Sequence, residues 1–473
     1  MNPSRPYECT GIGPRAFTRR ELLQSVSAGF GWMAFSALTS QAAAAEKSPL
    51  APKPPHFPAR AKRIIFLAMQ GGPAHQDMFD YKPKLKEDHG KPSGIRGGNK
   101  LVGSPFEFRQ HGQGGLWISE LFPELSTHAD ELCLLRSMHT DIPNHPQAFV
   151  QMHTGSAQFV RPSMGAWVLY GLGTENENLP GFITIAPPLA QGGAQNYGSS
   201  FLPAFYQGTR IGSAKEKGEG DAPAGSSQIP NLRNSDLPPD LQRKQLDLVQ
   251  AMNHDYLVKT SGNKEVEGVI QSFELAFRMQ TEVPKVMDIS RESAATLKMY
   301  GIGEGQTDGF GRQCLMARRC MEAGVRFVEL CHPGWDQHQG LSARLRANCT
   351  AIDKPIAALI HDLKTTGLLK DTLIIWGGEF GRTPDSRRDD GRDHNAKGYT
   401  MWMAGGGVKG GTSYGATDDY GYKAVENPVH IHDLHATALH MLGLDHEKLT
   451  YRYAGRDFRL TDVHGKIVKD ILS

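Results

Sequence analysis

Carboxylates and imidazoles occur together in three short clusters in the last third of the chain. The clusters are 334–338 (GWDQH), 378–382 (GEFGR) and 391–395 (GRDHN). The first two follow apolar runs, 325–330 and 372–376, that predict buried strands. Because the carboxyl ends of parallel strands meet at one edge of a sheet, side chains there converge on one crevice. Acids and histidines gathered in such a crevice are what a metal-dependent hydrolase needs.

Asp336 and His338 are the first candidate metal ligands. Residues two apart in an extended segment point the same way, so both side chains can reach one ion. Carboxylate with imidazole suits zinc, manganese or iron better than calcium, which prefers oxygen ligands alone. The alternative explanation is a capped turn with a solvated histidine. His394 precedes the apolar run 399–404, near the predicted sheet edge, and we expect it to be a further ligand.

Glu379, Arg382 and Asp77 are expected to complete the site. Glu379 ends a run typical of a central strand and is flanked by glycines, and a buried glutamate there needs a metal or a charged partner. Arg382 has two open roles, a salt bridge to Glu379 or a bidentate clamp on a substrate oxyanion. Asp77 follows the first apolar run and is expected to help with a second ion or with the substrate.

The segment 139–145 (HTDIPNH) is the expected place for a nucleophile, because helical periodicity follows it. A helix start offers free backbone N–H groups that stabilise developing negative charge. Thr140 offers a hydroxyl and Asp141 a carboxylate, and either can attack or both can bind metal. The alternative is structural, with Asn144 or Asp141 capping the helix.

Strand-like and helix-like segments alternate along the chain and predict an α/β fold. Apolar runs typical of strands cover 63–69, 132–135, 325–330, 372–376 and 399–404. Helical periodicity covers 146–152, 241–299 with breaks near Gly262 and Pro284, 352–369 and 432–442. The region 191–239 is rich in Gly, Ser, Asn and Pro and predicts an irregular insertion or lid. The histidines of 430–440 favour helix capping and packing over metal binding, because no HExxH arrangement is present.

The amino terminus predicts export. A twin-arginine start at Arg19 and Arg20, a short apolar stretch and the small residues 42–45 predict a signal peptide over 1–45. Residues 46–60 are rich in Pro and Lys and predict a linker, and 61–473 is expected to form one domain with an insertion around 190–300. We therefore expect a periplasmic or extracellular protein, and no stable membrane span, because the apolar stretch is too short.

Composition argues against several classes of partner. The chain has 52 basic and 50 acidic residues, and removal of residues 1–45 leaves 48 of each. A neutral mature chain lacks the charge that attracts nucleic acid or an anionic membrane surface. Five of the six cysteines lie beyond Cys9, and an odd count without CxxC spacing argues against a disulfide scaffold or a thiolate zinc site. One or two bridges among the cysteines at 314, 320, 331 and 349 are compatible with an oxidising compartment.

Together these strings resemble the alkaline phosphatase and sulfatase superfamily. Asp336–His338 resembles that superfamily's Asp-x-x-x-His pair with a shorter spacing, and 374–381 (IIWGGEFG) resembles its strand leading to Asp-His-Gly. His394 resembles its late histidine, and 141–145 resembles the Thr-Phe-Pro-Asn-His segment of nucleotide pyrophosphatase/phosphodiesterases. More closely, nearly everything after residue 60 is similar to a group of uncharacterised, exported bacterial proteins of this superfamily, through the strings 137–145, 335–338, 376–384 and 391–395.

The resemblance implies a three-layer, alkaline-phosphatase-like core with a mostly parallel central sheet and helices on both faces. It implies one or two divalent ions, zinc or manganese rather than calcium, and hydrolysis of an anionic phosphate or sulfate ester, for which a sulfated or phosphorylated glycan is one candidate. Two departures argue for an incomplete site: Gln70 stands where the superfamily has a strand-end aspartate, and Phe380 replaces the histidine of its acid–His pair. The alternative is a non-catalytic member of the fold that binds carbohydrate or a partner outside the cytoplasm.

Overall fold

A central sheet organises the part of the chain that the computed structural model describes, residues 49–212, 237–259 and 264–473. Within these residues the sheet has nine strands, in the order β14-β5-β13-β9-β1-β8-β6-β7, with β17 paired to β5. Their bounds are β1 Arg63–Met69, β5 Leu132–His139, β6 Phe182–Ile185, β7 Thr209–Ile211, β8 Phe327–His332, β9 Thr372–Gly377, β13 Tyr399–Ala404, β14 Thr412–Tyr414 and β17 Val429–His430.

Strand β13 runs against the other described strands of this sheet. It pairs antiparallel with β5 and with β9, where Trp402 lies opposite Trp376. The remaining pairs are parallel. The start of β13 therefore lies at the same edge as the carboxyl ends of β5, β9, β1 and β8. The predicted α/β fold with a mostly parallel sheet is confirmed.

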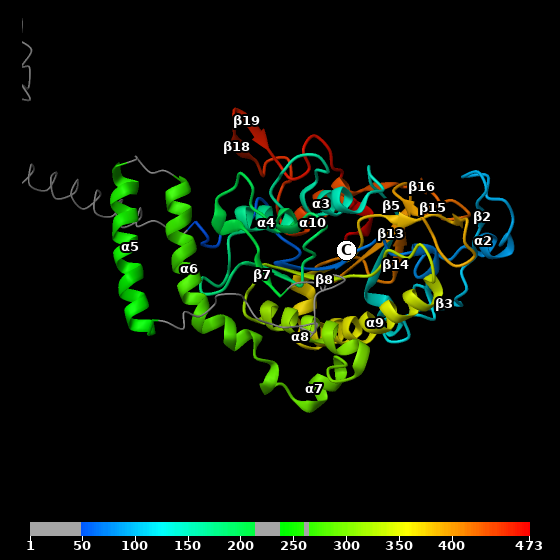
Figure 1. The fold of residues 1–473 in the computed structure, drawn as a ribbon, viewed down its shortest axis with the longest axis horizontal. Helices are drawn as coiled ribbons and strands as arrows, with labels where there is room; N and C mark the ends of the chain where they lie inside the picture. Colours follow the sequence, from blue (N-terminus) through cyan, green and yellow to red (C-terminus); the bar gives the residue numbers. More distant parts are fainter. Residues whose placement is uncertain (1–48, 213–236, 260–263) are drawn as a thin grey trace, which may run out of the picture. The chain divides into compact units, whose positions relative to one another are not determined.

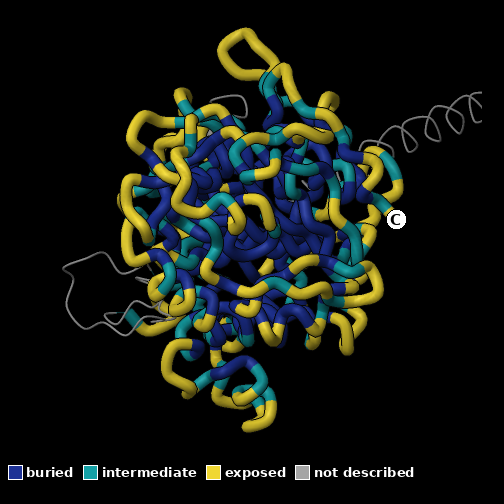
Figure 2. The backbone as a smooth tube through the Cα atoms, turned by 90° about the vertical axis from the view of Figure 1, so that its right-hand side faces the viewer, coloured by how far each residue is buried: buried dark blue, intermediate teal, exposed yellow. Residues whose placement is uncertain are grey.

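Helices cover both faces of the sheet. Figure 1 shows α8 (Asp308–Glu322) and α9 (Leu341–Thr365) on one side, and α3 (His145–Thr154), α4 (Met164–Leu172) and α10 (Ile431–Met441) on the other. Every residue of β1 is buried, which explains its continuous apolar sequence RIIFLAM. Figure 2 shows the buried backbone in the interior with exposed loops around it. The expected three layers are present.

The helical region expected at 241–299 is present as α5 (Pro239–Lys259), α6 (Lys264–Met287) and α7 (Ala294–Met299). Pro284 does not break α6, which continues to Met287. The break expected at Gly262 lies outside the described residues. The insertion expected at 191–239 is not wholly irregular, because β7 within it adds a strand to the central sheet beside β6. Helix α9 begins at Leu341, before the predicted 352, because Leu345 and Cys349 extend its buried stripe towards the amino terminus.

Small two-stranded sheets and one short helix surround the core. The pairs are β2 (Lys100–Leu101) with β11 (Asp385–Ser386), β3 (Phe108–His111) with β4 (Leu116–Ser119), β10 (Gly381–Arg382) with β12 (His394–Asn395), β15 (Ala416–Thr417) with β16 (Ala424–Glu426), and β18 (Tyr451–Tyr453) with β19 (Arg456–Phe458). The short helix is α2 (Pro83–Glu87). The β10–β12 pair matters most here, because it holds Arg382 opposite His394.

The predicted signal peptide, 1–45, and the first residues of the predicted linker lie outside the described residues. From Pro49 to Arg60 the chain forms neither helix nor strand, and its end is held by a hydrogen bond from Arg60 N to Met441 O at 2.8 Å. The five cysteines of the described chain are buried free thiols, so the bridges considered from the sequence are not formed. Among the described helices, none combines the length and apolar character needed to cross a bilayer.

Candidate metal centre

Four side chains converge at the edge of the sheet where β8 and β9 end and β13 begins. Asp336 and His338 follow β8, and His394 lies in β12, just before β13. His145 is the first residue of α3 and follows β5 across a short connection. Three chain segments far apart in sequence therefore supply one cluster, as the strand-end argument predicts.

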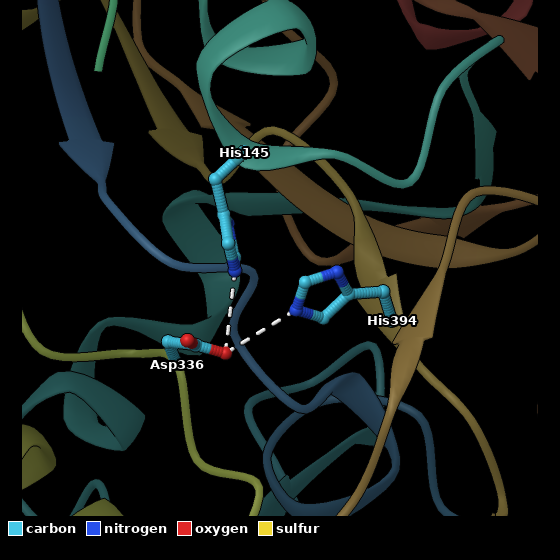
Figure 3. A group of neighbouring side chains, drawn as sticks. All are labelled: His145, Asp336 and His394. Atoms are coloured by element: carbon cyan, nitrogen blue, oxygen red, sulfur yellow. Dashed lines mark hydrogen bonds and ion pairs between the residues drawn. The ribbon is translucent and has the colours of Figure 1, made fainter.

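One carboxylate oxygen lies at the centre of the cluster. Asp336 Oδ1 is 3.2 Å from His145 Nε2, 3.1 Å from His338 Nε2 and 3.3 Å from His394 Nε2. His338 Nε2 and His394 Nε2 are 2.9 Å apart. Figure 3 shows the imidazoles of His145 and His394 both pointing towards Asp336. Three imidazole nitrogens and one carboxylate oxygen thus crowd around one point.

Each of the three histidines is held at its other ring nitrogen by an oxygen acceptor. Nδ1 of His145 lies 2.6 Å from Glu379 Oε1, and Nδ1 of His338 lies 3.1 Å from Asp393 Oδ1. Nδ1 of His394 lies 2.8 Å from the carbonyl oxygen of Pro143. An acceptor at Nδ1 holds a ring proton there, which makes Nε2 the nitrogen that a metal ion would bind.

The distances fit the chemistry of a metal ion. Ligand atoms at zinc bond lengths of about 2.0–2.1 Å in a tetrahedral arrangement lie roughly 3.3–3.4 Å from one another. The three separations measured from Asp336 Oδ1, 3.1–3.3 Å, are close to that value, whereas His338 Nε2 and His394 Nε2 are closer together, at 2.9 Å. His145 Nε2 is buried, and Asp336 Oδ1 is the acceptor beside it. His145, Asp336 and His394 form the one group of three or more acid, histidine or cysteine side chains in the described chain that is close enough to hold an ion.

Electrostatics within the cluster are strong. Burial lowers the pKa of His145, but hydrogen bonds to Asp336 and Glu379 outweigh it and raise that pKa to about 9. The metal-free His145 ring is therefore protonated at neutral pH, and a metal ion would have to displace the Nε2 proton. Burial raises the pKa of Asp336, but the hydrogen bonds from His145 and His394 and the charge of Arg382 hold it well below its usual range. The cluster therefore keeps Asp336 ionised, as a metal ligand must be.

Glu379 lies behind His145 and does not contact the other ligands. Its side chain is fully buried and accepts hydrogen bonds from Gly71 N at 3.0 and 3.1 Å and from Gly72 N at 3.3 Å. Its contact with His145 Nδ1 makes it the residue that orients this ring. Glu379, which the sequence predicted as a metal ligand, therefore contacts a ligand, His145, and not the position of the ion.

Arg382 lies beneath Asp336, with its side chain fully buried. Its Nη2 donates to Asp336 Oδ1 at 2.7 Å. Its other hydrogen bonds go to the backbone carbonyls of Gly71, Gly72, Trp335 and Arg392. The salt-bridge partner is thus Asp336 and not Glu379. Because protein oxygens already take its donors, Arg382 positions Asp336 and does not face a substrate oxyanion.

Asp77 lies away from the ligand atoms. It forms a bidentate salt bridge with Arg392, at 2.7 Å to Nε and 3.0 Å to Nη2, and both side chains are fully buried. This pairing joins the η1 turn (His75–Asp77) to the loop that carries His394. The expected role of Asp77 at a second ion or at the substrate therefore becomes a structural one.

Thr140 and Asp141, the expected nucleophiles, face another part of the molecule. Thr140 donates its hydroxyl to Gln151 Oε1 at 2.9 Å, and Gln151 donates in turn to Asp141. Asp141 Oδ1 also lies 3.3 Å from His430 Nε2. Neither side chain hydrogen bonds to the ligand cluster. Asn144 is the N-cap residue of α3, but its side chain makes no capping hydrogen bond.

Three histidines of the segment 430–440 serve helix capping and packing, as the sequence predicts. His430 caps α10 by accepting a hydrogen bond from His432 N. His432 and His435 donate from Nε2 to the carbonyl oxygens of Gly155 and Met152, at 2.7 and 2.8 Å. These side chains fasten α10 to α3.

A model of the family described as "Protein of unknown function (DUF1501)" matches residues 61–472. The chain belongs to this family. The sequence had predicted a family of this kind, with nearly the same extent. Among curated proteins, none matches the chain.

Solved structures resemble this member of the DUF1501 family over most of its length. A sulfatase from Pseudoalteromonas sp. is 13% identical with a TM-score of 0.38, and the match covers 82% of this chain and 68% of that one. A phosphonate monoester hydrolase from Silicibacter pomeroyi is 11% identical with a TM-score of 0.37, covering 87% and 76%. The C-terminal periplasmic domain of EcEptC from Escherichia coli, in complex with zinc, is 8% identical with a TM-score of 0.36, covering 89% and 99%. Likenesses this distant leave the chemistry of this chain to be argued from its own residues.

Phe380 and His145 are the residues through which this site departs from the expected one. The Phe380 ring is buried and lies 4.7 Å from the His145 ring and 4.8 Å from the His394 ring, so it forms an apolar wall beside the cluster. His145 was not among the predicted ligands, although its position at a helix start beyond a strand end carries the same signal as the others.

Proposed function

We propose that this protein is an exported, metal-dependent hydrolase of phosphate or sulfate esters. One observation carries the proposal: three imidazole Nε2 atoms surround Asp336 Oδ1, and every Nδ1 is held by its own oxygen acceptor. Histidines arranged only to pair with an aspartate have no need of this shared orientation. The pattern matches that of metal-ligating histidines, which are fixed from behind by acceptors.

His145, Asp336 and His394 lie close enough together to hold the ion. His338, whose Nε2 lies 3.1 Å from Asp336 Oδ1, would join them as a fourth ligand after a small side-chain shift. Nitrogen-rich ligands with one carboxylate favour zinc or manganese over calcium. When bound, such an ion supplies Lewis-acid polarisation of an ester oxygen and a more acidic water. The twin-arginine route carries folded proteins, which is compatible with metal loading before export.

The surrounding residues leave one side of the cluster open. The side chain of Asp336 is 45% exposed and that of His338 is 37% exposed, whereas Arg382 and Glu379 behind them are buried. An ester approaching from solvent can therefore reach Asp336 and His338. Phe380 excludes water from the flank of His145 and His394, which strengthens the electrostatic interactions there.

Water is the nucleophile that this geometry favours. In the described chain, no serine or threonine hydrogen bonds to the four ligand side chains, and the Thr140 hydroxyl is engaged by Gln151. Thr140→Val is therefore expected to keep wild-type turnover. Loss of turnover in that variant, with metal content and melting temperature unchanged, would restore Thr140 as the nucleophile.

The proposal is tested by metal content and turnover measured together. The purified mature protein is loaded with zinc or manganese, and aryl phosphate, aryl phosphodiester and aryl sulfate are offered as substrates. His394→Ala is expected to lose both metal and turnover, whereas His254→Ala, an exposed histidine on α5, is expected to lose neither. Wild type without bound metal, and with turnover no greater than that of His394→Ala, would refute the proposal.

A non-catalytic role is the second candidate, favoured by the position of Thr140 and Asp141 away from the cluster. In that case the fold would bind carbohydrate or a partner outside the cytoplasm. A melting temperature unchanged by a chelator, together with glycan binding and no turnover, would support this second candidate.

A further inference from the structure

A polar recess lies directly beside the candidate metal centre. It encloses about 410 Å³, and its lining includes Arg96, Asn99, His338, Arg387, Arg388 and Asp393. Three arginines face one carboxylate there, so the recess carries net positive charge. Nothing in the hydrolytic site described above uses this space.

The arginines of the recess differ in how far they are already paired. Arg96 Nη1 lies 3.1 Å from Asp393 Oδ2, and Arg388 Nη1 donates to the carbonyl oxygen of His338 at 3.2 Å. Arg387 is exposed and makes no side-chain hydrogen bond or ion pair with any residue in the described ranges. Its guanidinium therefore keeps its donors for a ligand, and guanidinium groups match oxyanions with paired hydrogen bonds.

Asn99 provides a second, independent sign of a ligand. It is 5% exposed, and its side-chain nitrogen is buried without an acceptor. A buried N–H group left without an acceptor is costly, and such groups in proteins are nearly always satisfied. Asn99 lines the recess, so a rotation of its side chain would let an oxyanion there supply the missing acceptor next to the arginines.

The recess and the ligand cluster lie on opposite sides of one imidazole ring. His338 directs Nε2 towards Asp336 and His394, and it directs Nδ1 towards Asp393 at 3.1 Å. The other oxygen of Asp393 pairs with Arg96. A group bound in the recess is therefore a neighbour of the scissile ester and not the scissile ester itself.

We propose that the recess binds a second oxyanion of the substrate, so that the preferred substrate carries at least two sulfate or phosphate groups. The inference rests on the proposed function, because it assumes that the first of these groups lies at the metal cluster. Arg387 and Asn99 would contact the second group, and Arg96 and Arg388 would add positive charge around it.

Calorimetric titration of the zinc-loaded mature protein tests this inference. The probes are fructose 6-phosphate against fructose 1,6-bisphosphate, and galactose 6-sulfate against galactose 2,6-disulfate, which separate phosphate from sulfate. The member of each pair with two anionic groups should bind more tightly. Arg387→Gln should weaken its binding about 3-fold, as expected for an exposed ion pair, and should leave binding of the member with one anionic group unaffected. Arg109→Gln, which removes an exposed arginine outside the recess lining, should change neither affinity.

The inference is overturned if both members of each pair bind equally, or if Arg387→Gln and Arg109→Gln behave alike. Turnover separates this failure from failure of the proposed function. Hydrolysis that is equally fast for esters with one and with two anionic groups, in wild type and Arg387→Gln alike, overturns the anion site in the recess but not the proposed hydrolase activity. A selective loss of bisphosphate or disulfate binding in Arg387→Gln, in a protein without turnover, supports the anion site and refutes the hydrolase.

Discussion

Glu379→Gln is expected to weaken zinc binding by roughly 10- to 100-fold, although Glu379 would not touch the ion. The carboxylate holds His145 Nδ1 at 2.6 Å and also accepts hydrogen bonds from the backbone N–H groups of Gly71 and Gly72. It thereby keeps a proton on Nδ1, so that Nε2 is the nitrogen that would exchange its proton for a metal ion. The change from carboxylate to amide keeps the side-chain volume and replaces one hydrogen-bond acceptor with a donor.

The magnitude follows from the count of acceptors. A carboxylate offers two oxygens to these three N–H groups, whereas an amide offers one oxygen and one NH₂ group. Whichever way the amide of the variant is turned, its NH₂ group faces another N–H donor, either at His145 or at the glycines. A lost hydrogen bond to a charged group costs about 1.5–3 kcal/mol. At about 1.4 kcal/mol for each tenfold change in affinity, that corresponds to roughly 10- to 150-fold.

The assay is a competition titration of metal-free protein with zinc and a chromophoric chelator. Glu329→Gln is a matched control, because Glu329 is also buried and also pairs with a histidine, His153, at 2.8 Å. The control variant should lower the melting temperature without changing zinc affinity. Glu379→Gln binding zinc within about twofold of wild type, or both variants losing the same factor, would refute the assigned role of Glu379.

Three further predictions follow from other residues. Asp353 is buried, and that burial raises its pKa from 3.8 to about 6. Between these two values the folded state binds a proton that the unfolded state releases. The free energy of unfolding should therefore fall by up to about 3 kcal/mol as pH rises from about 4 to about 6. Denaturant titrations of Asp353→Asn should lack that slope, and an unchanged slope would contradict it. Asp77→Asn leaves the buried Arg392 guanidinium unpaired and should cost about 3–5 kcal/mol of stability, a loss below about 1 kcal/mol counting against the buried pair. Replacement of both Arg19 and Arg20 by Lys should abolish export of a reporter fused to residues 1–60, and export at the wild-type level would refute the twin-arginine assignment.

The parts of the fold that local sequence could predict are those in which both faces of an element are buried. The apolar runs at β1, β9 and β13 are continuous because helices cover both sides of the sheet, and they were identified at nearly their observed bounds. The positions of Asp336, His338 and His394 followed from these runs, since each lies beside the end or the start of a strand at one edge.

Local sequence could not predict the direction of β13, or that β7 would be a strand of the central sheet. A buried strand has the same apolar sequence in either direction, so the antiparallel pairing of β13 with β9 depends on its neighbours and not on its composition. Strand β7 is three residues long within a polar region, and it is a strand because β6 presents it with an open edge.

For this protein, sequence alone determined the family, the layered α/β fold and three members of the candidate metal centre. Tertiary structure decided what each charged residue does: His145 joins the ligands, Glu379 and Arg382 hold them from behind, and Asp77 is committed to Arg392. The physical reason is that a buried charge is defined by its partner, and these partners come from distant parts of the chain. Residue type and local spacing show which reactions and contacts a side chain is capable of. Which of these it performs depends on its neighbours at the assembled edge of the sheet.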